Sequence, residues 1–151
     1  RTMNYSARFI QLAEEINFGM PMFVVDKVND ALNGHKKPLK GSKVLVLGVS
    51  YKSDVAELRE SPALDVIHLL TSKGADVAYH DPYFDCVDVE GVSLIRTELT
   101  QEVLKNSDCV VITTDHSVYD WQWIANNTDM LVDTRNATAG ICPIKCEIHR
   151  L

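Results

Sequence analysis

The chain has 151 residues, 46% of them hydrophobic and 24% charged, and a formal net charge of −6 at pH 7. This is enough for one globular core, and the negative charge argues against nonspecific nucleic-acid binding, which needs a basic surface. No apolar run approaches the ~18 residues of a membrane span, and nothing resembles a signal peptide. We therefore expect no nucleic acid and no membrane among the partners. The four scattered cysteines favour a reduced, cytoplasmic protein.

The chain opens on a helical pattern. Apolar residues recur at helical spacing through Asn4–Asn33, and Pro21 either kinks one long helix or starts a second one at its first turn. Gly34 is the predicted stop of this helix. A basic, turn-rich linker, HKKPLKGS, follows. We predict a helical segment with its linker over residues 1–40 and an α/β domain over residues 41–151.

Beyond the linker, apolar runs alternate with helical patterns. The predicted strands are Lys43–Leu47, Asp76–His80, Val92–Ile95, Cys109–Thr113 and Met130–Asp133. The predicted helices are Ala63 to about Ser72, Gln101–Lys105 and Tyr119–Ala125. This alternation predicts an α/β fold with a doubly wound, Rossmann-like parallel sheet. From Gly140 onward the pattern is weak and predicts either an edge strand or a packed tail.

The loop after the first strand carries two cations. Gly48 ends the strand, and Lys52 and Arg59 follow before Ser61 and Pro62 supply an N-cap and a first helical residue. Ligands of doubly wound folds bind beyond the carboxyl ends of the strands, so this loop predicts a site for an anion.

A third cation follows the strand at Met130–Asp133. If that strand lies near the first one in the sheet, Arg135 and Lys52 face the same crevice. A diphosphate suits such a pair, because lysine supplies a point charge and arginine a fork for two oxygens.

Several motifs occur together along the chain: GVSYK, LRESPAL, YHDPY, TTDHSVYDW and LVDTRNA. In this order they resemble the C-terminal nucleotide-binding domain of the UDP-glucose/GDP-mannose dehydrogenase family, from about Arg8 to about Ala139. The resemblance implies NAD-dependent oxidation of a UDP-sugar to its uronic acid, and its wording leans toward UDP-N-acetylhexosamines over UDP-glucose. It gives substrate-binding positions to Tyr51, Lys52 and Arg135, and a contact with NAD to Arg59.

The resemblance also implies parts that this sequence does not show. Family members carry an N-terminal NAD-binding domain and a catalytic cysteine upstream. They use the equivalent of the first helix to link domains and pack dimers, so a homo-oligomer is expected. Here no G-x-G-x-x-G follows a strand, and no cysteine lies in the catalytic motif. Since the chain also begins without methionine, we expect a fragment that contains no catalytic residue and is inactive alone.

Other polar residues near the strand ends receive structural interpretations. Asp81 follows the second strand, where a dinucleotide-binding fold places its ribose carboxylate, but without the glycine pattern we predict a turn. His80 is interpreted as structural, and Ser61 as a cap. Asp115 and His116 are placed at the crevice without an assigned role.

A metal site is not expected. Cys142, Cys146 and His149 have C-x₃-C-x₂-H spacing, but a structural zinc site needs four closed ligands and no fourth is evident nearby. Trp121 and Trp123 are interpreted as core and rim residues.

Two alternative functions stay open from the sequence. One is a standalone dinucleotide-binding module, against which the missing glycine pattern counts. The other is an assembly module, because the apolar stripe of Asn4–Asn33 needs a covering partner.

Overall fold

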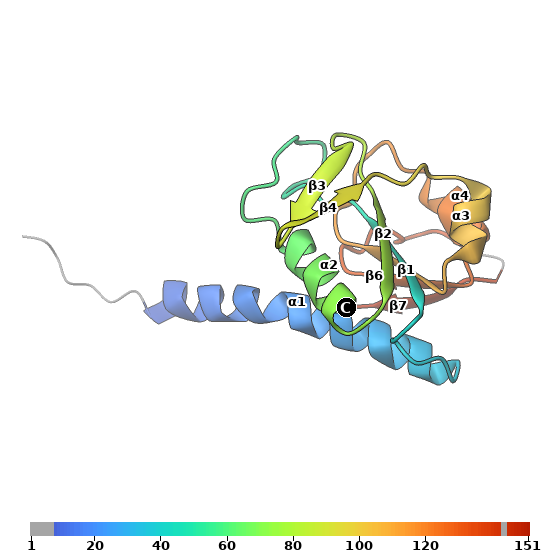
Figure 1. Cartoon of the computed structure of the whole chain (residues 1–151), viewed down its shortest axis with the longest axis horizontal. Coiled ribbons are helices and arrows are strands. Elements are labelled where there is room, and N and C mark those ends of the chain that lie inside the picture. Colours follow the sequence, from blue (N-terminus) through green and yellow to red (C-terminus); the bar gives the residue numbers. More distant parts are fainter. Residues whose placement is uncertain (1–7, 143–144) are drawn as a thin grey trace, which may run out of the picture.

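Five parallel strands form the centre of the molecule (Figure 1). The computed structural model describes residues 8–142 and 145–151. The strands lie in the order β2-β1-β5-β6-β7. Their bounds are Lys43–Leu47 for β1, Asp76–His80 for β2, Cys109–Ile112 for β5, Met130–Asp133 for β6 and Glu147–Arg150 for β7. The predicted α/β sheet is confirmed, and the weakly patterned C-terminal segment supplies one of its two edge strands, β7.

Helices cover both faces of this sheet (Figure 1). Residues of α1 (Arg8–Gly34) and α2 (Pro62–Ser72) share one hydrophobic core with Val44 and Val46 of β1. Residues of α3 (Gln101–Asn106) and α4 (Trp121–Asn126) share a second core with Leu45 and Leu47. Successive side chains of a strand point to opposite faces, so burial on both sides explains why these strands are continuously apolar.

The first helix is continuous through Pro21, so the alternative of a second helix starting there was wrong. Its two halves differ in their surroundings. Val24, Val25, Val28, Ala31 and Leu32 are buried in the same core as the sheet. The earlier turns project from the domain (Figure 1), and the predicted helical residues 4–7 lie outside the described part of the chain.

The stop of α1 also differs from its prediction. Gly34 is the last helical residue, and Lys36 takes the left-handed conformation with φ 59°. Lys36 N–H donates to the Asn33 carbonyl and Lys37 N–H donates to the Leu32 carbonyl, the pair of bonds that defines a Schellman motif. At the end of α2 the same motif uses Gly74, with φ 89°.

A two-stranded antiparallel hairpin lies outside the main sheet. It consists of β3 (Cys86–Val89), which was not predicted, and β4 (Val92–Ile95), which was. Glu90 and Gly91 both have positive φ, at 50° and 81°, as a two-residue type I′ turn requires. Val87 and Val89 pack into the core under α2, so the hairpin extends the first hydrophobic layer.

Candidate functional site

Three loops converge at the carboxyl edge of the sheet, after β1, β5 and β6. The three strands are neighbours, so the loops that follow them lie side by side. Gly48 turns the chain out of β1 with φ 84°, and a Cβ there would collide with the Thr114 carbonyl oxygen. The Thr113 hydroxyl donates to the Gly48 carbonyl. Only glycine allows the first loop to lie this close to the second.

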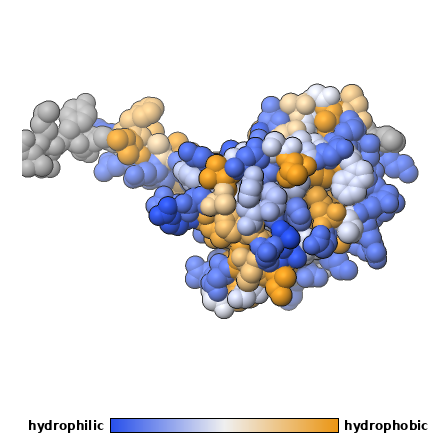
Figure 2. Space-filling model, turned by 90° about the horizontal axis from the view of Figure 1, so that it is seen from above, coloured by the Kyte–Doolittle hydropathy of each residue, from blue (hydrophilic) through white to orange (hydrophobic). Residues whose placement is uncertain are grey.

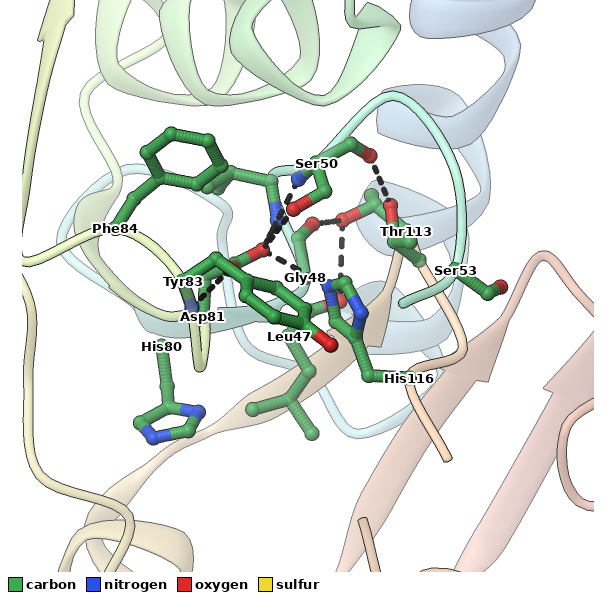
Figure 3. A network of polar contacts seen from close by, with 12 residues as sticks. Leu47, Gly48, Ser50, Ser53, His80, Asp81, Tyr83, Phe84, Thr113 and His116 are labelled. Carbon is green, nitrogen blue, oxygen red and sulfur yellow. Dashed lines mark hydrogen bonds and ion pairs between the residues drawn. The ribbon is translucent and has the colours of Figure 1, made fainter. Parts of the chain in front are cut away.

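Asp81 anchors the first loop from the end of β2 (Figure 3). Its carboxylate is fully buried, and Oδ2 accepts from Val49 N–H at 2.7 Å and from Ser50 N–H and Ser50 Oγ, both at 3.0 Å. Oδ1 accepts from Tyr83 N–H at 2.9 Å, which is the predicted turn. Burial alone raises the pKa of Asp81, but hydrogen bonds from the backbone of Tyr83, Val49 and Ser50 outweigh it, and the pKa is lowered.

His116 joins the same network from the loop after β5 (Figure 3). It is fully buried; Nδ1 lies 2.9 Å from Asp54 N, and Nε2 lies 3.0 Å from Asp81 Oδ2. A backbone N–H can only donate, so Nδ1 accepts and Nε2 carries the proton that is donated to Asp81. The sequence placed His116 at the crevice, whereas the structure encloses it beneath the first loop.

Tyr51 and Lys52 are both exposed on the outer side of this anchored loop. The Lys52 ammonium lies 5.6 Å from the centre of the Tyr51 ring, which is cation–π distance. The two predicted ligand-binding side chains therefore present one joint surface of charge and aromatic face.

Asp115 connects that loop to Arg135. Its Oδ1 accepts from Ser53 Oγ at 2.6 Å and lies 3.4 Å from Arg135 Nε. The carboxylate of Asp115 therefore contacts both Ser53, the residue next to Lys52, and Arg135. This is how the structure relates the two predicted cations, which come from strands separated by β5.

A cavity of about 350 Å³ opens beside Arg135. It is lined by Asp115, Asp133, Thr134, Arg135, Asn136, Arg150 and Leu151. Buried Asp133 fixes the loop, because its carboxylate accepts from the backbone N–H groups of Arg135, Ala137 and Thr138 at 3.0, 3.1 and 2.8 Å. Arg150, whose guanidinium donates to the Thr138 carbonyl at 3.1 Å, is a cation that the sequence reasoning missed. Only the pairing of β7 with β6 brings it here.

Arg59 lies apart from these groups. Its exposed guanidinium forms an ion pair with Glu57, with Nη2 2.7 Å from Oε2, and this pairing lowers the pKa of Glu57 to about 2. Ser61 occupies the N-cap position of α2, but its hydroxyl makes no capping bond. It donates to the Val49 carbonyl at 2.7 Å, so the predicted cap instead ties α2 to the first loop.

The remaining candidate groups are the potential metal-ligating side chains and His80. Among residues 8–142 and 145–151, no three His, Cys, Asp or Glu side chains come together as metal ligands. His80 Nδ1 lies 2.9 Å from the Tyr119 hydroxyl, which itself donates to the His80 carbonyl at 3.0 Å. These bonds agree with a structural role for His80.

The residues present do not fit an NAD site of this chain's own. A ribose-binding carboxylate must offer a free oxygen at the rim. Asp81, which holds that position, is completely buried and accepts from two backbone groups of the loop and from His116. The alternative of a standalone dinucleotide-binding module therefore lacks its central contact.

The fold and the site together define a doubly wound α/β domain with lysine and arginine side chains at the carboxyl edge of its sheet. The profile of the UDP-glucose/GDP-mannose dehydrogenase family, UDP binding domain, matches residues 45–140. The chain belongs to this family.

Proteins of similar sequence include two dehydrogenases that are named for UDP-sugars. A UDP-N-acetyl-D-mannosamine dehydrogenase of Methanococcus maripaludis is 37% identical over 116 residues, covering 76% of this chain and 25% of the relative. A UDP-glucose 6-dehydrogenase of Rickettsia bellii is 30% identical over 142 residues, covering 88% of this chain and 32% of the relative. The chain thus spans about a quarter to a third of these relatives.

A solved structure of another UDP-sugar dehydrogenase has a similar fold. The UDP-N-acetyl-mannosamine dehydrogenase of Staphylococcus aureus superposes with a TM-score of 0.76 and 27% identity, covering 97% of this chain and 34% of that one. Within the described part of the present chain, each helix is too short or too polar to cross a lipid bilayer.

Proposed function

We propose that this chain is the C-terminal, UDP-binding part of an NAD-dependent UDP-sugar 6-dehydrogenase. Its substrate would be a UDP-N-acetylhexosamine or UDP-glucose, oxidised to the uronic acid. The names of the relatives support this substrate class, and the match to the UDP binding domain supports the division of labour. The observation that carries the proposal is the tethering of the Lys52 loop and Arg135 to one carboxylate, Asp115.

The roles of the residues follow from their chemistry. Lys52 would offer its ammonium to the diphosphate, Arg135 would offer a guanidinium fork, and the Tyr51 ring would pack against the nucleotide. Asp115 would orient these groups without contacting the phosphates, because two negative charges repel each other. Arg59 would leave Glu57 and meet the phosphates of NAD from its exposed position.

The remaining parts of the reaction would lie outside this chain. NAD supplies the hydride acceptor when bound, and it would be held mainly by an N-terminal domain together with the catalytic cysteine. We also propose a homo-oligomer, because several apolar residues of α1 are exposed. A cytoplasmic enzyme is part of the proposal, and the free thiols of all four cysteines are compatible with it.

Calorimetric titration with UDP tests the proposal. The chain should bind UDP with an affinity that falls as salt rises, because the contacts are ionic and exposed. Lys52→Ala and Arg135→Ala should each lose about 1.5–3 kcal/mol, the range for hydrogen bonds to charged groups. Lys105→Ala, on α3, and Arg59→Ala, in the same loop as Lys52, serve as matched controls and should bind UDP like the unaltered chain. Unchanged affinity in both site variants would remove the proposed site.

An assembly role is a second candidate. It does not compete with UDP binding, because it concerns the projecting half of α1, where Phe9 and Phe18 are 84% and 91% exposed.

A further inference from the structure

The loop that carries Tyr51 and Lys52 is held at both of its ends, although its middle is exposed. At the first end, Val49 and Ser50 donate their backbone N–H groups to buried Asp81, at 2.7 and 3.0 Å. At the other end, the N–H of Asp54 donates to His116 Nδ1 at 2.9 Å. The two anchors are themselves joined, since His116 Nε2 lies 3.0 Å from Asp81 Oδ2 (Figure 3).

The far end of the loop needs such an anchor. Asp54 has a φ of 61°, a left-handed conformation that is costly for a residue with a side chain, although less so for Asp and Asn. Its carboxylate is also used, because Oδ1 accepts from Ser117 N–H at 2.9 Å. His116 and Ser117 are adjacent in sequence, so one turn after β5 holds both the backbone and the side chain of Asp54.

The burial of the Asp81–His116 pair exceeds what packing alone requires. Both side chains are fully excluded from solvent. Apolar residues of the same shape would fill this space without the cost of desolvating polar groups. Both ring nitrogens of His116 are used, Nε2 by Asp81 and Nδ1 by the loop. The pair therefore connects three segments, the loop after β1, the end of β2 and the turn after β5, at a single point.

We propose that Asp81, His116 and Asp54 form a positioning device that fixes the Tyr51–Lys52 loop in its ligand-binding conformation before the nucleotide arrives. This inference rests on the proposed function, in which Lys52 binds UDP. A loop ordered in advance does not lose its conformational freedom on binding, so affinity is gained without any contact between the device and the ligand. His116 is thus a positioning residue and touches no reacting atom.

The test uses variants at the two ends of the connection. In His116→Gln the amide nitrogen can still reach Asp81, but the acceptor at the Nδ1 position is lost. Asp54→Ala removes the bond to Ser117 and disfavours the left-handed backbone at an exposed site, so it leaves the core intact. Asp54→Asn keeps an acceptor and tolerates the same φ, and it isolates the effect of the charge alone.

UDP affinity and amide hydrogen exchange are then measured on the same samples. If the loop of a variant occupies the competent conformation about a tenth of the time, the Kd for UDP rises roughly tenfold. We expect this rise in His116→Gln and Asp54→Ala, together with faster exchange of the amides of residues 49–54. Asp54→Asn should stay near the unaltered chain. So should Asp108→Asn, a control at the opposite end of β1, where Asp108 accepts from Lys43 N–H at 2.8 Å.

An unaltered Kd in Asp54→Ala, or in a folded His116→Gln, would overturn the positioning role; if His116→Gln does not fold, Asp54→Ala decides alone. A general loss of stability is separated by Asp108→Asn, which should lower the melting temperature without moving the Kd. Failure of the unaltered chain to bind UDP would instead refute the proposed function. In that case the exchange rates of residues 49–54 still decide whether the device orders the loop.

Discussion

At the scale of single residues, buried carboxylates fix the conformations of the loops that form the site. Asp81 follows β2 and Asp133 is the last residue of β6. Each is fully buried, and each accepts several hydrogen bonds from a loop. Both replace the water that would otherwise satisfy those backbone N–H groups. The cations that they position, Lys52 and Arg135, remain exposed.

Asp133 provides a direct test of this arrangement. Burial alone raises its pKa, but hydrogen bonds from the side chain and backbone of Thr138 and from the backbone of Arg135 and Ala137 outweigh this, so the pKa is lowered. Asp133→Asn replaces an acceptor by a donor facing these N–H groups, and should lower the free energy of unfolding by about 1–3 kcal/mol at pH 7.

The pH dependence follows from the sign of the shift. A carboxyl whose pKa is lower in the folded chain stabilises it fully above its unfolded pKa of about 3.9, and this contribution is lost as the pH falls through the folded value. Urea unfolding at pH 7 and at steps below pH 4 should therefore show the gap between the unaltered chain and Asp133→Asn narrowing in acid. Asp26→Asn, on the exposed side of α1, should show no gap at either pH. A gap that stays constant would mean that ionisation of Asp133 adds no stability.

At the scale of elements, α1 is a helix with two different environments. Its C-terminal half completes the core under the sheet, so this part of the predicted helical segment packs with the α/β domain. Its N-terminal half projects, and Figure 2 shows hydrophobic surface on the projecting part. Phe9, Ile10, Leu12, Ile16 and Phe18 are each more than half exposed. Exposed apolar surface of this kind is typical of interaction sites.

We predict that the chain self-associates through this half of α1. Phe18→Glu should shift the chain toward the monomer, because burying an unpaired carboxylate in an apolar interface is costly. Light scattering over a concentration series measures the change. Ile95→Glu is the matched control, since Ile95 is 80% exposed but lies on the β3–β4 hairpin. A monomeric unaltered chain, or equal effects of the two substitutions, would contradict the prediction.

At the scale of the whole molecule, the chain matches only part of the length of its relatives. It spans 25% and 32% of two relatives that are dehydrogenases, and its site offers cations and hydrogen-bond donors. Buried Cys109 illustrates the limit of its chemistry: burial raises the pKa of the thiol to about 12, which makes it a poor nucleophile.

The isolated chain should therefore bind UDP without oxidising a UDP-sugar. With purified chain, NAD and UDP-glucose or a UDP-N-acetylhexosamine, absorbance at the NADH band should stay at the level of the buffer. A full-length dehydrogenase of the family serves as the positive control in the same assay. NADH formed by the chain alone, and abolished by replacing one of its cysteines, would refute this division of labour.

The sequence by itself determined the elements of the sheet and the loops that carry the candidate cations. Continuous apolar strands such as Lys43–Leu47, the prolines and glycines at helix ends, and Lys52 and Arg135 after their strands are local signals, readable because each depends on near neighbours. The strand Cys86–Val89 was missed, because it is only four residues long and its first exposed position holds a cysteine, which does not stand out as polar.

Only the tertiary structure decided what the polar residues do. Asp81 read as a turn, Ser61 as a cap and His116 as a crevice residue, but each gains a partner that lies 12 to 35 positions away in the chain. Arg150 reaches the cavity beside Arg135 only because β7 pairs with β6. Hydrogen bonds across such separations depend on strand order and register, and these are set by the packing of the whole core, which no local pattern encodes.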